Sequence, residues 1–195
     1  MQNEMQKRYF MKDYRQNLFK TRKVLCTGNP DRPYTIASAV RELYPNSTFI
    51  HKENGYNLTN IEEILKLKLC ELFKSHNTFI NASYIGPYVQ TNLLTLCHES
   101  VKICDVFNIG STHEYDMIGT ELYKESKLDL RKKSLELNSY RFKTCHVIVG
   151  AIKKTNKVDQ FNLIDINEIC SIIDWVTKQR FNVPIISVDQ PKEPW

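Results

Sequence analysis

From residue 23 onward, two patterns of apolar and polar positions alternate along the chain. Short runs rich in β-branched and apolar residues, such as residues 24–27 (VLCT), are typical of buried strands. Between them lie longer segments, such as residues 61–73, whose apolar residues recur every three or four positions, as in helices packed on one face. The pattern predicts strands at 24–27, 48–50, 78–81, 106–109, 146–149 and 183–188. It predicts helices at 35–44, 61–73, 89–101, about 122–138 and 167–179.

Strands that alternate with helices are typical of parallel sheets. Because crossovers between parallel strands are right-handed, the series predicts a doubly wound, Rossmann-like parallel β-sheet with helices on both faces. We expect a single α/β domain over residues 23–195, a length at which one core is stable without disulfides or metals. Ligands of such sheets bind beyond the carboxyl ends of the strands, so candidate chemistry is sought in the loops that follow them.

Residues 1–22 are predicted to form a separate basic arm. Residues 1–23 hold seven Lys and Arg against two Asp and Glu, which accounts for the whole formal net charge of +5. Tyr9, Phe10, Tyr14 and Leu18 recur at helical spacing, so a short amphipathic helix is expected. The arm could bind nucleic acid or a membrane surface, or it could pack on the domain or a second subunit, or simply fray. We favour packing or fraying over binding, because seven charges give only a modest electrostatic footprint.

Composition argues against several classes of protein. Apolar residues make up 42% and charged residues 25% of the chain, close to the average of globular domains, so wholesale disorder is excluded. The chain has no run of 18 apolar residues, and its first residues are polar, so we expect neither a membrane span nor a secretory signal. The six cysteines include no CxxC pair, which predicts buried free thiols in a reducing compartment. A cytoplasmic protein is therefore expected.

Polar residues of particular types stand where the predicted strands end and where the following helices begin. In chain order they are Thr27, Gly28, Asn81, Ala82, Ser83, Asn92, Ser111, Tyr123 and Lys127. They resemble the glycine-rich turn, the Asn-Asn-Ala-Gly segment, the helix asparagine, the serine and the Tyr-x-x-x-Lys pair of the short-chain dehydrogenase/reductase family. A Tyr-x-x-x-Lys match alone is expected by chance, so the resemblance rests on order and placement. It is closest to short, diverged members found in tailed bacteriophages, which would act in the host cytoplasm.

The resemblance implies an NAD(P)-dependent oxidoreductase that transfers hydride between a nicotinamide and a small carbonyl compound or alcohol. It assigns proton transfer to Tyr123, a hydrogen bond to the substrate oxygen to Ser111, and the positioning of a water near Lys127 to Asn92. A free phenol has a pKa near 10, poorly matched to neutral pH. We therefore expect the charge of Lys127, one helical turn further on, to favour the phenolate.

The glycine-rich turn departs from the family pattern. Arg32 and Tyr34 stand where the second and third glycines are found, and Pro30 and Pro33 remove two N–H donors from a turn that binds phosphate. Arg32 could compensate as a charged phosphate clamp. Two outcomes stay open: altered dinucleotide binding, or none.

The residues after the second predicted strand bear on the choice of cofactor. A base there suits the 2′-phosphate of NADP and an acid suits the ribose of NAD, so His51 and Lys52, together with Arg32, favour NADP over NAD, with Glu53 next to them as a counter-argument. The residues that the resemblance assigns to the cofactor are Thr27, Gly28, Asn29, Arg32, His51, Lys52, Asn57, Leu58, Asn81, Ala82, Ser83, Tyr123, Lys127 and Gly150.

Three further functional hypotheses concern metals, partners and alternative activities. The spacing of His113, Glu114 and Asp116 matches no metal site, so we expect these residues to line the substrate mouth. The resemblance implies a small-molecule substrate and a homodimer or homotetramer that pairs through the helices at 89–101 and 122–138. Two alternatives remain: a diverged nucleotide-binding or scaffold protein without turnover, and a nucleic-acid-binding module that uses the basic arm.

Overall fold

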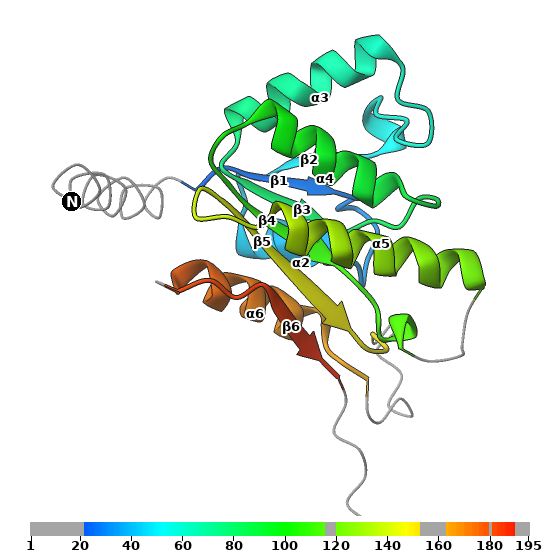
Figure 1. Cartoon of the computed structure of the whole chain (residues 1–195), viewed down its shortest axis with the longest axis vertical. Coiled ribbons are helices and arrows are strands. Elements are labelled where there is room, and N and C mark those ends of the chain that lie inside the picture. Colours follow the sequence, from blue (N-terminus) through cyan, green and yellow to red (C-terminus); the bar gives the residue numbers. More distant parts are fainter. Residues whose placement is uncertain (1–21, 116–119, 153–162, 180, 190–195) are drawn as a thin grey trace, which may run out of the picture.

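The computed structural model describes residues 22–115, 120–152, 163–179 and 181–189 (Figure 1), so the predicted arm at 1–22 lies, apart from Arg22, outside the described residues. The strands are β1 Val24–Thr27, β2 Thr48–Ile50, β3 Thr78–Asn81, β4 Cys104–Ile109, β5 Phe142–Val149 and β6 Ile185–Val188. The helices are α2 Ile36–Leu43, α3 Glu63–Ser75, α4 Val89–Ser100, α5 Glu121–Leu137 and α6 Ile166–Lys178, with the short 3-10 helices η1 Lys52–Asn54 and η2 Thr112–Glu114.

The strands form one parallel sheet in the order β2-β1-β3-β4-β5-β6. β1 pairs with β2 on one side and with β3 on the other, so that Cys26 stands opposite both Phe49 and Ile80. The strand order reverses at this point, where a crevice opens at the carboxyl edge of doubly wound sheets. The predicted fold class is confirmed.

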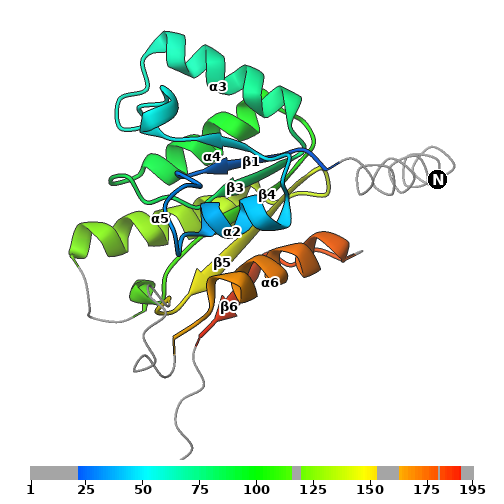
Figure 2. The ribbon, with the colours of Figure 1, turned by 180° about the vertical axis from the view of Figure 1, so that it is seen from behind.

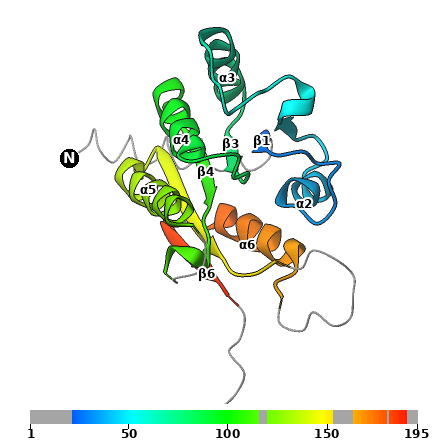
Figure 3. The same cartoon turned by 90° about the vertical axis from the view of Figure 1, so that its right-hand side faces the viewer.

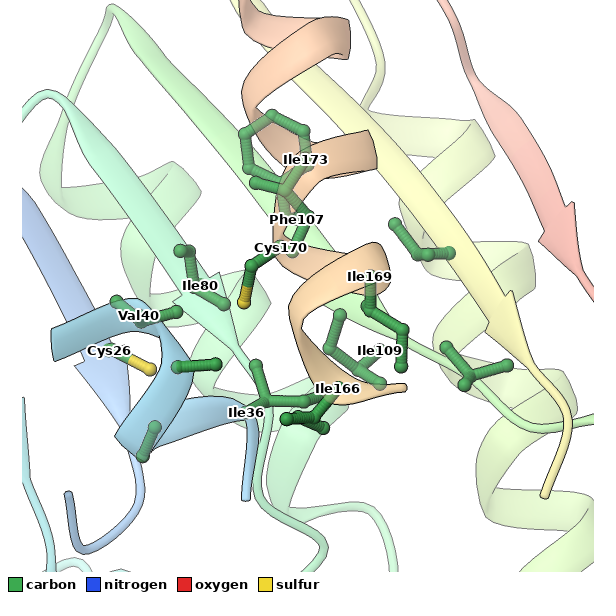
Figure 4. Packing of buried hydrophobic residues seen from close by; sticks show 14 of the residues in the cluster. Cys26, Ile36, Val40, Ile80, Phe107, Ile109, Ile166, Ile169, Cys170 and Ile173 are labelled. Atoms are coloured by element: carbon green, nitrogen blue, oxygen red, sulfur yellow. The ribbon is translucent and has the colours of Figure 1, made fainter. Parts of the chain in front are cut away.

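Helices cover both faces of the sheet. Figure 3 shows α3, α4 and α5 on one side and α2 and α6 on the other, and Figure 2 shows α2 and α6 in front of the sheet. Successive strand side chains point to opposite faces, so Leu25 packs in the core under α3 and α4 while Cys26 packs under α2 and α6. In that second core, Ile36 of α2 lies with Ile169 and Ile173 of α6 (Figure 4). The sheet is thus fixed from both sides, which holds its carboxyl edge rigid.

β5 begins at Phe142, well before the predicted start at residue 146. Phe142 is buried and pairs with Cys104 on β4, but the polar residues that follow it conceal the strand pattern. Thr144 tolerates burial because its hydroxyl donates to the carbonyl of Ser134 on α5. The strand also carries His146 into the sheet interior.

Two further predictions concern the burial of the cysteines and the absence of a membrane-spanning helix. Five of the six cysteines are buried and free, and Cys70 is partly exposed, so most thiols are packing residues as predicted. Within the described part of the chain, no helix combines the length and the apolar character needed to cross a membrane.

Candidate active site

A cavity of about 470 Å³ opens at the carboxyl edge of the sheet, among the loops that follow β1, β3, β4 and β5. The first turns of α2 and α5 contribute to its walls. The predicted site residues that line it are Gly28, Asn29, Arg32, Ala82, Ser83, Ser111, Tyr123, Lys127 and Gly150. A partly apolar cavity of this size with a few polar groups is the usual form of a small-molecule site.

Ser111 and Tyr123 are joined by a hydrogen bond between their side chains. Ser111 lies two residues after the end of β4, and its hydroxyl also accepts a hydrogen bond from the N–H of His113 at 3.3 Å. Tyr123 lies in the first turn of α5, which begins after the N-cap Thr120. The end of one strand and the start of the next helix therefore bring two hydroxyls to the same cavity, where both can reach one ligand oxygen.

Lys127 lies one helical turn after Tyr123 and is 3% exposed. Its Nζ donates to Oε1 of Gln90 at 2.7 Å and to the carbonyl of Ile109 at 2.8 Å, and it lies 5.6 Å from the ring centroids of both Tyr84 and Tyr123. Burial lowers the pKa of Lys127 to about 8. A lysine ammonium has three N–H donors, so one remains for a ligand in the cavity.

The pKa of Tyr123 is raised, whereas the sequence led us to expect that Lys127 would lower it. Burial is the largest cause, a hydrogen bond from Ser111 acts in the opposite direction, and the charge of Glu114 raises the pKa further. Lys127 lies over the aromatic ring, and two of its N–H donors are engaged elsewhere. The phenol therefore keeps its proton at neutral pH, which suits Tyr123 to donate a proton rather than to accept one.

Asn92 lies away from this group, contrary to its predicted role. Its side chain is exposed on α4 and lines a separate hollow, together with Leu58. Gln90, two residues earlier, occupies the place beside Lys127, and its Nε2 donates to the carbonyl of Asn81 at 2.7 Å. Two residues along a helix turn a side chain by about 200°, a difference that sequence spacing alone did not resolve.

Thr27 and Asn81 tie the strand ends together and do not line the cavity, contrary to their prediction as cofactor contacts. Both are fully buried. The Thr27 hydroxyl accepts hydrogen bonds from the N–H groups of Ala82 at 2.8 Å and Ser83 at 2.9 Å. Asn81 Nδ2 donates to the carbonyl of Gln90 at 2.8 Å. These two side chains thus fix the loop after β3 and the first turn of α4.

Gly28 is required where the turn approaches the loop after β3. Its φ is +126°, a region that favours glycine. A Cβ there would lie 2.7 Å from Ser83 Oγ and 3.0 Å from Ala37 Cβ. The glycine therefore lets the start of α2 sit close to the cavity.

The rest of the turn has few N–H groups to offer a phosphate. The N–H groups of Asp31 and Arg32 bond back to the side chain and the carbonyl of Asn29, at 2.8 and 3.3 Å. In α2, the capping box uses the N–H of Ser38. The N–H groups of residues 36 and 37 have no hydrogen-bond partner in the described part of the chain and lie at the cavity. A phosphate would therefore bind at the start of the helix.

Two of the three basic residues that favoured NADP, Arg32 and His51, contact Glu53. Nη2 of Arg32 lies 2.7 Å from one oxygen of Glu53, and Nδ1 of His51 lies 2.9 Å from the other. The hydrogen bond from His51 is the largest cause that lowers the pKa of Glu53 to about 2. Neither His51 nor Lys52 lines the cavity. The charge of Arg32 is thus compensated by Glu53, and the preference for NADP stays a prediction.

The segment predicted to contact adenine also lies outside the cavity. The Asn57 side chain accepts a hydrogen bond from the Thr59 hydroxyl at 2.7 Å. Leu58 is 2% exposed and belongs to the core under α3 and α4. The structure therefore does not bring Asn57 or Leu58 to the cavity.

The three residues predicted to line the substrate mouth, His113, Glu114 and Asp116, do not all lie at the cavity. His113 lines the cavity, Glu114 is buried behind it, and Asp116 lies outside the described residues. Nowhere in residues 22–115, 120–152, 163–179 and 181–189 do three His, Cys, Asp or Glu side chains gather as a metal site. The Glu114 partner is His146 on β5, with Nε2 2.8 Å from Oε1.

Sequence reasoning did not single out Gln90, Tyr84 or His146. Gln90 is a polar residue on the apolar, buried face of α4, and such a residue could have been recognised in the sequence as one that needs a polar partner. The Tyr84 ring packs 4.7 Å from that of Tyr123, and the sequence signal was its position directly after Ser83. His146 gave no signal, because its partner lies 32 positions away.

Comparisons with known proteins support the fold. No family sequence model matches the chain, and no curated protein matches it. Solved structures do match: a short-chain dehydrogenase from Sphingobium yanoikuyae in complex with NADPH aligns with a TM-score of 0.64 and 14% identity, over 85% of this chain and 87% of that one. The 3-alpha-hydroxysteroid dehydrogenase of Pseudomonas sp. B-0831, complexed with NADH, aligns with a TM-score of 0.63 and 13% identity, over 86% of this chain and 95% of that one.

A short-chain dehydrogenase from Leptospira borgpetersenii with bound NAD+ gives a TM-score of 0.64 and 17% identity, over 86% of this chain and 91% of that one. At this level of identity the likeness shows the fold, and function has to be argued from the site. The chain has the Rossmann-like α/β fold of short-chain dehydrogenases.

Proposed function

We propose that the protein is an NAD(P)-dependent oxidoreductase of the short-chain dehydrogenase type that acts on a small carbonyl compound or alcohol. The observation that carries the proposal is the meeting of Ser111, Tyr123 and Lys127 at one cavity beside the reversal in strand order. The nicotinamide cofactors bound by structures of the same fold support it.

In the proposed reduction, a nicotinamide held at the cavity would supply the hydride for the carbonyl carbon. The Ser111 hydroxyl orients the carbonyl oxygen, and Tyr123 gives that oxygen its phenolic proton. The ammonium of Lys127 stabilises the phenolate that remains, and Gln90 holds the ammonium in place at 2.7 Å. In the reverse direction the phenolate takes the proton from the alcohol.

The cavity fits a dinucleotide at two points. Two free N–H groups at the start of α2 can hold a phosphate. The absence of a Cβ at Gly28 and Gly150 lets the backbone of the loops after β1 and β5 form part of the wall, since a Cβ at Gly150 would lie 2.5 Å from Asp189 Oδ1. Either NADP or NAD is compatible with this arrangement, and the 2′-phosphate of NADP would have to draw Arg32 away from Glu53.

Reduced-cofactor fluorescence and turnover together test the proposal. We expect NADPH or NADH to bind and a panel of small aldehydes and ketones to include a substrate. Tyr123→Phe should abolish turnover and leave the dissociation constant unchanged. Tyr140→Phe, in the loop before β5, is the matched control and should keep full turnover. Turnover by the Tyr123→Phe variant would refute the catalytic assignment.

A second candidate function is favoured by the altered turn. Its internal hydrogen bonds and its two prolines leave fewer donors for phosphate than the family pattern, as expected of a diverged nucleotide-binding protein without turnover. Cofactor binding without reduction of any carbonyl would favour this candidate. We also propose a homodimer through α4 and α5, which light scattering of the full chain would test.

A further inference from the structure

A carboxylate and an imidazole lie buried directly behind the candidate catalytic serine. Glu114 ends η2, His146 lies in β5, and both side chains are 0% exposed. Oε1 of Glu114 lies 2.8 Å from Nε2 of His146 and accepts a hydrogen bond from the N–H of Ser111 at 3.1 Å. One carboxylate oxygen therefore links the backbone of the serine to the strand beside it.

The chain makes room for this contact at Gly110. A Cβ there would lie 2.4 Å from Glu114 Oε1 and 2.4 Å from His146 Nε2. Real Cβ atoms do not approach other atoms so closely, so the glycine is a condition of the contact. The loop after β4, with Gly110 and Glu114, and the distant His146 on β5 thus fit together to bury this pair.

Charged and titratable groups face Glu114 from α5. Nη1 of Arg131, a partly exposed residue, lies 3.5 Å from Oε2 of Glu114. The charge of Glu114 also acts on Lys127 and Tyr123, which line the cavity. On its own element the neighbour is His113, which lines the cavity as well. The carboxylate thus lies between Arg131 at the surface and the reactive groups of the site.

Glu114 and His146 are not expected to contribute much to the free energy of unfolding. A buried carboxylate gains little over well-packed apolar residues, because removing its charge from water is costly. Nδ1 of His146 is buried without a hydrogen-bond partner among the described residues, and Oε2 of Glu114 has only the ion pair with Arg131 at 3.5 Å, which adds to that cost. The position of the pair behind Ser111 therefore points to a role in the site.

We propose that Glu114, held by His146, is a positioning residue: it fixes the backbone of Ser111 and supplies the buried negative charge that keeps the amine of Lys127 protonated. The role in catalysis rests on the proposed function, whereas the effect of Glu114 on Ser111 and Lys127 can be measured without cofactor or substrate. Nζ of Lys127 donates to the carbonyl of Ile109 at 2.8 Å, and Oε1 of Glu114 packs against the next residue, Gly110, so the two charges lie on either side of the same short stretch of backbone. Burial lowers the pKa of Lys127, and the charge of Glu114 opposes this. Without the carboxylate, a larger fraction of the chains would carry a neutral amine at neutral pH, which cannot stabilise a phenolate.

Direct observation of the Lys127 side chain tests the charge. In the full chain labelled with 15N-lysine and without cofactor, the Lys127 Nζ resonance is followed against pH and assigned by its loss in Lys127→Met. We expect the titration midpoint in Glu114→Gln to lie about one pH unit below that of the wild type. Glu125→Gln, which removes an exposed carboxylate two residues from Lys127, is the control and should leave the midpoint unchanged. An unchanged or higher midpoint in Glu114→Gln would overturn the proposal.

Arg131→Gln serves if Glu114→Gln fails to fold, since Arg131 lies near the surface. Removing this cation should raise the titration midpoint of Lys127, and no change or a fall would overturn the proposal.

The amide proton of Ser111 tests positioning. Its resonance should move upfield in Glu114→Gln and stay in place in Glu125→Gln, and an unmoved resonance in Glu114→Gln would overturn that part of the proposal. No cofactor takes part, so failure of NAD(P)H to bind would refute the proposed function and leave this result standing.

Discussion

Lys127→Met should stabilise the protein at neutral pH while removing a group that the proposed chemistry needs. The pKa of the buried amine is about 8 instead of the ordinary 10.5, a difference worth on the order of 3 kcal/mol in the free energy of unfolding. Methionine removes the buried charge but leaves Gln90 and the Ile109 carbonyl without their donor, at about 1 kcal/mol each. The net gain at pH 7 is therefore about 1 kcal/mol.

The sign of the effect reverses at high pH. Below pH 8 the folded chain carries a buried ammonium, and its cost is fully present. Between pH 8 and 10.5 the folded chain has lost the proton that the unfolded chain still binds, so the free energy of unfolding of the wild type rises with pH. At pH 10 most of the cost of the buried ammonium is gone, so the variant, which has lost the two hydrogen bonds, should be less stable than the wild type.

Urea denaturation at pH 7 and pH 10 measures both differences, with unchanged m values as the check that the unfolding transition is the same. Lys132→Met, an exposed substitution on the same helix, is the control and should lie within about 0.5 kcal/mol of the wild type at both pH values. A Lys127→Met variant that is less stable at pH 7, or that shows the same difference at both pH values, would refute the reasoning.

Three further substitutions test particular contacts. Gly110→Ala should lower the free energy of unfolding by about 3 kcal/mol because its Cβ would force the buried side chains of Glu114 and His146 apart, whereas Gly86→Ala, whose Cβ meets nothing closer than 3.7 Å, should change it little in the same denaturation assay. Glu53→Gln frees Arg32 and should raise the affinity for NADPH relative to NADH about tenfold in fluorescence titrations; an unchanged ratio would contradict this. Tyr34→Gly should raise the melting temperature, because a tyrosine at φ 58° stores about 1 kcal/mol of backbone strain; a lower melting temperature would count against it.

The sequence predicted the fold because hydrophobic periodicity and strand composition agree along the chain. Strand β1 and helix α2 lie where the pattern of residues 24–27 and 35–44 placed them. The start of β5 was missed because Lys143 and Thr144 interrupt the apolar run, and only the contact of Thr144 with α5 explains why a polar residue is buried there.

The candidate site was predictable where chemistry follows directly from a strand end. Ser111 and Tyr123 were found in this way, and the structure places both at the cavity. Asn92 was misplaced because only the helix rotation decides which polar residue of α4 faces Lys127, and that residue is Gln90. Charge compensation between elements far apart in sequence, as between Arg32 and Glu53, has no local signal.

Calorimetric titration with NADPH and NADH tests the central claim most directly. The account predicts saturable binding of at least one of the two to the wild-type chain, and binding about tenfold weaker to the well-folded Lys127→Met variant, which lacks the ammonium at the cavity. If neither dinucleotide gives saturable heat with the wild type, the cavity is not a cofactor site and the proposed oxidoreductase activity is wrong.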